Sequence, residues 1–113
     1  MEIVDKKITI NELKKTAANT FGDLVKAVVD VDRELIALDA ELHSDLEALL
    51  IEDGSKQKSL WGINLYPELK GDGFIEFDSL INIRPSVPNR SRGVENEEMQ
   101  KRIILIVAKW IIL

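Results

Sequence analysis

The first apolar residues of the chain recur at helical spacing behind a clear start signal. Thr9 and Glu12 have the spacing of a capping box, in which each side chain accepts a hydrogen bond from the backbone amide of the other. A helix is therefore predicted to begin at Ile10, and Gly22 is suited to ending it. The apolar positions of this helix form one stripe, which we expect to face the core: Ile10, Leu13, Ala17 and Phe21.

Four extended segments are predicted from alternation and from β-branched residues. Leu24 to Asp32 is rich in valine, Leu35 to Asp39 is a second apolar run, and the polar segment between them indicates a hairpin, although it lacks glycine. Leu60 to Tyr66 and Phe74 to Arg84 alternate more clearly between apolar and polar residues. This second pair is expected to form a hairpin with one apolar face and one polar face.

Two more helices are predicted from capping signals. Ser44 stands three residues before Glu47, which indicates a short helix from Asp45 to about Asp53. Asn96 is followed by two glutamates, a pattern typical of the start of a helix, and this last helix is expected to run to the chain end.

The end of the last helix is unusually apolar. Between Ile103 and Leu113 every residue except Lys109 is apolar, so a single amphipathic stripe does not describe it. We expect burial on more than one side, with the helix inside the core as the favoured arrangement. The alternative is a self-association surface, a homo-oligomer formed through this helix and its last residues: Trp110, Ile111, Ile112 and Leu113.

The order of these elements, α, β, β, α, β, β, α, predicts the α+β class. We expect two layers, with a mostly antiparallel four-stranded sheet and helices packed on one face. At 113 residues the chain is long enough for one sizeable core and too short for two. Residues 1–113 are therefore expected to form a single domain.

Composition excludes several classes of protein. The chain has no cysteine, so disulfides, thiolate chemistry and cysteine-bound zinc are ruled out. The N-terminus lacks the pattern of a secretory signal, and the longest apolar run is shorter than the roughly 20 residues of a membrane span. We therefore expect a cytoplasmic protein with no membrane partner.

Charge narrows the choice of ligand. The net charge of −5 disfavours binding to duplex DNA. Residues 54–92, however, hold six bases against four acids, which permits a local anion site. Because the sequence contains neither a Walker-type loop nor a dinucleotide fingerprint, we expect no cofactor.

Polar residues of the second strand pair and the loop after it form the leading candidate site. Arginine forks bind phosphate or carboxylate oxygens in pairs, so this group indicates an anion site for a phosphate, a nucleotide or RNA. The alternative is that the arginines pair with nearby carboxylates, as surface charges commonly do. The candidate residues are Asn64, Tyr66, Asn82, Arg84, Asn89, Arg90 and Arg92.

A weaker candidate site lies around the only histidine. His43, together with Asp45 and neighbouring carboxylates, could act as a general acid or base in a small hydrolase or nuclease. The alternative is that His43 is a hydrogen-bonded residue next to a helix start. One histidine without cysteine does not make a zinc site, so we expect no metal. A non-enzymatic binding module is the leading hypothesis, and the enzyme is the alternative.

Several stretches of the sequence also carry a family resemblance. Over nearly its whole length the chain resembles a small family of prokaryotic proteins of unknown function. This resemblance implies no activity and no catalytic residues, and only that the protein is an ordinary cytoplasmic one from a bacterium or archaeon. It rests on Phe21-Gly22-Asp23, Glu41-Leu42-His43-Ser44-Asp45, residues 52–64, Ile81-Asn82-Ile83-Arg84-Pro85 and Asn89-Arg90-Ser91.

Overall fold

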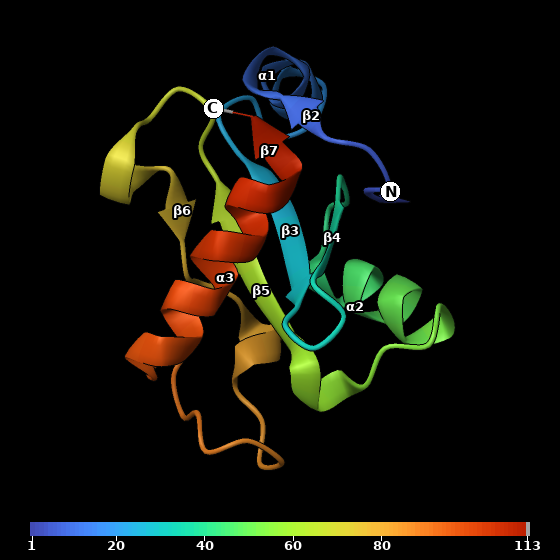
Figure 1. The fold of residues 1–113 in the computed structure, drawn as a ribbon, viewed down its shortest axis with the longest axis vertical. Coiled ribbons are helices and arrows are strands. Elements are labelled where there is room, and N and C mark those ends of the chain that lie inside the picture. The colour runs from blue at the N-terminus through green and yellow to red at the C-terminus, as the bar shows by residue number, and fades with distance from the viewer. Residues whose placement is uncertain (113) are drawn as a thin grey trace.

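The computed structural model describes residues 1–112 and contains one main antiparallel sheet (Figure 1). Its five strands lie in the order β1-β4-β3-β5-β6, and two further short strands, β2 and β7, pair with each other in parallel. The α+β class with an antiparallel sheet is therefore confirmed, with five strands rather than four. The strands are β1 (Glu2–Ile3), β2 (Ile8–Thr9), β3 (Val25–Asp30), β4 (Leu35–Leu38), β5 (Leu60–Leu65), β6 (Ile75–Glu76) and β7 (Ile111–Ile112).

Three α-helices and three single-turn 3-10 helices connect these strands. The α-helices are α1 (Ile10–Ala18), α2 (His43–Glu52) and α3 (Glu97–Trp110). The 3-10 helices are η1 (Gln57–Ser59), η2 (Gly71–Gly73) and η3 (Leu80–Asn82). Among residues 1–112, no helix has the length and apolar character that crossing a membrane requires.

Two of the three predicted helix starts are confirmed. Thr9 and Glu12 form the complete capping box before α1, and the Asn96 side chain accepts a hydrogen bond from Met99 at the start of α3. The predicted start of α2 is wrong. That helix begins at His43, preceded by Leu42, which makes no side-chain cap.

Helices pack on both faces of the sheet, so the expectation of a single helical layer is wrong. The physical reason is β3, the central strand, which presents apolar residues on both sides. Val29 packs in the cluster that includes α1 and α3, whereas Val28 packs against Leu46 and Leu50 of α2. In Figure 1, α3 crosses one face of the sheet while α2 lies on the other.

The hairpin between β3 and β4 forms without glycine. One carboxylate oxygen of buried Asp30 accepts hydrogen bonds from the amides of Asp32 and Arg33, both at 2.9 Å, which holds the turn. Glu34 then takes a positive φ of 55° before β4 begins. Glu34 thus takes the left-handed conformation that such turns usually give to glycine, and the Asp30 carboxylate stabilises the turn.

The long strand predicted from Phe74 to Arg84 is wrong beyond Glu76. After β6 the chain folds back over β5, so that Ser79 lies very close to Gly62. A β-carbon added at Gly62 would lie 2.5 Å from the Ser79 β-carbon. The Asn82 side chain then takes the place of a neighbouring strand, because it accepts a hydrogen bond from the Gly62 amide at 2.8 Å and donates one to the Gly62 carbonyl at 3.0 Å.

The last helix is buried on one side only, which corrects the expectation of burial on several sides. Its inner face is covered, but Leu105 is 70% exposed and Ile104 is 45% exposed. The chain leaves the helix at Trp110, which is half-buried and donates to the Glu34 carbonyl at 2.9 Å, and then forms β7. The predicted surface residue Leu113 lies outside the described residues.

Candidate functional site

The buried asparagines of the predicted anion site hold the loop after β6 in place. Asn82 binds the edge of β5, as described above. Asn89 is buried too, and its amide donates to the Asn82 and Gly93 carbonyls at 3.0 and 2.8 Å. The Asn89 side-chain oxygen accepts from the Glu95 amide at 2.9 Å. Both side chains are thus engaged within the chain.

Arg84 is buried against the same edge of β5. Its guanidinium donates to the Leu60 carbonyl, lies 4.9 Å from the centre of the Trp61 ring and stands 3.9 Å from the Glu47 carboxylate. Burial lowers the pKa of Arg84, and the charge of Glu47 opposes that shift. Glu47 thus supplies a negative charge beside this arginine.

The strand residues of the predicted anion site gather around a carboxylate. Asn64 and Tyr66 lie on neighbouring positions of one face and both donate to Glu76, at 2.8 and 3.1 Å. Burial and then Glu76 raise the pKa of the Tyr66 phenol. The negative charge of Glu76 disfavours a second anion at this part of the sheet.

The two remaining arginines of the loop point to different surroundings. Arg92 pairs with Asp78 at 2.7 Å, as the ion-pair alternative expects. Arg90 is exposed, and among residues 1–112 its side chain forms no ion pair. The structure therefore brings Asn82, Arg84 and Asn89 together as a support for the loop, and anion binding by this group stays a prediction.

His43 is buried at the start of α2. Its Nε2 lies 2.8 Å from the Ile63 carbonyl, to which it donates. Burial lowers the pKa of His43 despite this bond, so the ring is neutral at pH 7. Asp45 is exposed one residue beyond Ser44, and no cluster of metal-binding side chains occurs within residues 1–112. The contacts of His43 agree with the hydrogen-bonded alternative, and the catalytic role stays a prediction.

His43→Gln is expected to flatten the dependence of the unfolding free energy on pH. Histidine has an ordinary pKa of 6.5 and a lower one in the folded chain, so the unfolded chain binds more protons below pH 6.5. The wild-type protein therefore loses stability as the pH falls through 6.5, by at most about 1.4 kcal/mol per pH unit. Glutamine keeps a donor and does not titrate. Urea unfolding at pH 7.5 and 5.5 measures the slope, and an equal slope in both proteins would contradict burial of a neutral ring.

A further surface feature was not identified from the sequence. An apolar groove of about 1190 Å³ lies between α3 and the β6 side of the sheet. α3 packs over β3 and β4, and β6 lies to one side of this helix (Figure 1). The residues that line it are Ile10, Lys14, Phe74, Ile75, Phe77, Gln100, Ile104, Val107 and Ala108, and residues 67–72 close one side.

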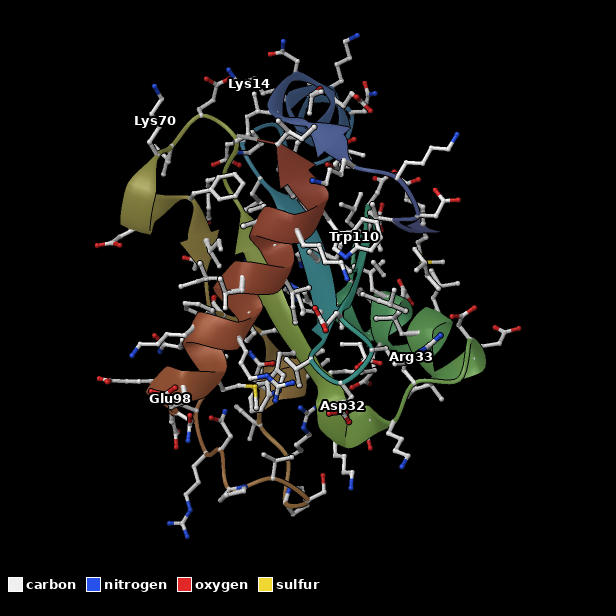
Figure 2. All side chains as sticks on the ribbon, in the orientation of Figure 1. Lys14, Asp32, Arg33, Lys70, Glu98 and Trp110 are labelled. Carbon is white, nitrogen blue, oxygen red and sulfur yellow. The ribbon has the colours of Figure 1, made fainter. Side chains whose placement is uncertain are left out.

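Charged residues lie at one end of this groove. Lys14 and Lys70 stand near the C-terminal end of α3, and Glu98 lies at the opposite end of that helix (Figure 2). Glu68 is 3.6 Å from Lys14. Within residues 1–112 no ion pair includes Lys70, which leaves its charge available at the groove.

The signal for this groove was present in the sequence. The last helix has more apolar positions than one buried stripe requires, and the surplus residues Ile104 and Leu105 lie on or beside the groove. The sequence pattern thus showed the surplus of apolar residues in the last helix. It did not show the groove, because the position of the groove depends on where β6 ends.

Comparisons with known proteins identify the family and nothing finer. A search of curated proteins and a search of solved structures each found no match. A family model described as a protein of unknown function matches residues 2–110, which confirms the resemblance to a family of unknown function. The chain therefore belongs to the family DUF5674 of proteins of unknown function.

Proposed function

We propose that this protein is a non-enzymatic interaction module that binds an amphipathic segment of a protein partner in the groove between α3 and β6. The observation that carries the proposal is the apolar groove itself, whose floor includes the half-buried side chains of Ile75 and Phe77. Large apolar surfaces left open on a folded domain mark sites of interaction.

The extent of the apolar surface favours a protein segment over a small molecule. A small molecule is normally enclosed by its pocket, which buries most of its surface. Here the apolar surface continues outside the groove, because Leu105 is 70% exposed and does not line it. Leu69, on the opposite wall, is also exposed. A helix lying along α3 would cover the groove together with these leucines.

The charges at the groove indicate that one end of the partner segment is acidic. Lys70 is free of ion pairs within residues 1–112, and Lys14 stands at the same end. Lys14 already pairs with Glu68, and Asp72 also lines the groove, so Lys70 is the lysine that an acidic end of the partner segment would complement. The expected partner is therefore a helix with an apolar stripe and acidic residues in one terminal turn.

Ile104→Glu is expected to weaken binding of such a helix by at least about tenfold, because it places a charge against the apolar wall of the groove. The probe is a labelled synthetic helix with leucine at every third or fourth position and two glutamates in its first turn. Fluorescence anisotropy measures its affinity. A scrambled peptide of the same composition tests whether the stripe matters.

Leu80→Glu is the matched control, since Leu80 is 68% exposed and does not line the groove. It should bind the probe as the wild-type protein does. Equal affinity for the probe and its scrambled version, or full affinity in Ile104→Glu, would overturn the proposal.

A further inference from the structure

We infer, building on the proposed function, that the partner is a second copy of this chain, whose α3 lies antiparallel along the first α3 and covers its groove. The chain itself contains a segment of the required chemistry. α3 is a helix with exposed apolar residues, Ile104 and Leu105, and with acidic residues, Glu97 and Glu98, in its first turn.

The exposed leucine and the groove make one self-complementary surface. Leu105 stands beside the groove on the outer side of α3, and Ile104 forms part of the groove wall. In a two-fold arrangement each copy presents the same patch, so Leu105 of one copy can enter the groove of the other while the reverse contact forms. Both apolar features that the monomer leaves open are then covered by one interface.

The distribution of charge selects the antiparallel orientation. Figure 2 shows Glu98 at one end of α3 and Lys14 and Lys70 beyond the other. If two α3 helices cross near Leu105, Glu98 lies about seven residues, or about 10 Å, to one side of the crossing. In the antiparallel arrangement, Glu98 of one copy therefore lies level with the C-terminal end of the other copy's α3, near its two lysines. A parallel arrangement would instead bring like charges together.

Lys70 and Glu98 are available for these contacts, whereas Lys14 already pairs with Glu68 at 3.6 Å. Within residues 1–112 the one ion-pair partner of Glu98 is exposed Lys101, at 3.5 Å and three residues further along the same helix. Exposed pairs of this kind contribute little and exchange readily. Lys70 has no ion pair within residues 1–112.

Sedimentation equilibrium over a range of concentrations tests the inference. The wild-type protein is expected to dimerise, and Leu105→Glu should raise the dimer dissociation constant by about a hundredfold or more, because it places a charge at the centre of the interface. Leu80→Glu, at a residue that is 68% exposed and does not line the groove, should dimerise as the wild-type protein does. Circular dichroism checks that each variant is folded. A monomeric wild-type protein at every concentration, or unchanged dimerisation of Leu105→Glu, would overturn the inference.

A charge exchange tests the orientation. Lys70→Glu is expected to weaken the dimer by about tenfold, since the change acts at two symmetry-related contacts. Adding Glu98→Lys in the same chain restores opposite charges across an antiparallel interface and should recover most of the affinity. Further weakening in the double variant would rule out the antiparallel arrangement.

The synthetic helix separates failure of this inference from failure of the proposed function. If the wild-type protein is monomeric but binds the synthetic helix with dependence on Ile104, the groove is an interaction site and the second copy is not its partner. If it neither dimerises nor binds the helix, the interaction function of the groove is lost as well.

Discussion

Gly62→Ala is expected to lower the free energy of unfolding by about 3 kcal/mol, because the interior has no room for one additional carbon at this position. The added β-carbon would lie 2.5 Å from the β-carbon and 2.6 Å from the hydroxyl of Ser79, and 3.1 Å from Ile81. Atoms of this kind do not approach so closely, so the chain after β6 has to move away from β5. That movement also separates Asn82 from the Gly62 backbone.

Urea unfolding measures this effect, and Gly93→Ala provides the control. The nearest atom to a β-carbon at Gly93 is 3.5 Å away, an ordinary contact, so this variant should keep nearly the wild-type midpoint. Removing the Ser79 side chain in the Gly62→Ala protein, as Ser79→Gly, should recover part of the loss. A Gly62→Ala protein as stable as wild type would show that the chain does not lie so close to β5.

Asn82→Ala is expected to cost about 3 to 5 kcal/mol of stability, since it removes three hydrogen bonds and leaves buried groups without partners. The Asn82 side chain accepts from the Gly62 amide and donates to the carbonyls of Gly62 and Arg92. Without this side chain, the Gly62 amide and carbonyl would lose their hydrogen-bond partner, and neither water nor another strand would replace it. Chemical denaturation gives the difference, and Asn11→Ala, at an exposed asparagine, should change stability very little.

Asn82→Asp tests whether the donors of this side chain matter as much as its acceptor. An aspartate has nearly the same shape and can still accept from the Gly62 amide. It brings a carboxylate oxygen against the Gly62 carbonyl, to which Asn82 now donates at 3.0 Å. We expect a loss of stability at neutral pH comparable to that of the alanine variant. A stable Asn82→Asp protein would mean that the contact with the Gly62 carbonyl is not essential.

The elements predicted correctly from the sequence are those whose signals are local. Thr9 and Glu12, and likewise Asn96 with its following glutamates, act within one helical turn, so the spacing of the residues alone determines the contact. Valine-rich β3 and its neighbour β4 were predictable for a similar reason. The helical layers were not, because apolar residues on both sides of β3 leave no polar face to mark the solvent.

The elements that were wrong depend on contacts between distant residues. Phe74 to Arg84 alternates as a strand does, but Asn82 reaches back to Gly62, 20 residues earlier, and ends the strand pairing there. The polar residues of this segment were predicted to face a ligand because their contacts with distant parts of the chain cannot be seen in the sequence. Arg84 and Asn89 have the chemistry of an anion site, and the backbone atoms that they bind cannot be inferred from spacing.

The pairing of β2 with β7 determines when the fold can be completed. Ile8 lies opposite Ile111, about a hundred residues further along the chain, and Thr9, which starts α1, lies opposite Ile112. Contacts between such distant residues form late, because the chain must first give up much of its conformational freedom. We therefore expect α1, which supplies Ile10 and Lys14 to one end of the groove and also packs on β3, to be fully fixed in place only once the last helix has docked. The amides of this strand pair should consequently exchange with solvent through a local opening, well before the central strands of the sheet.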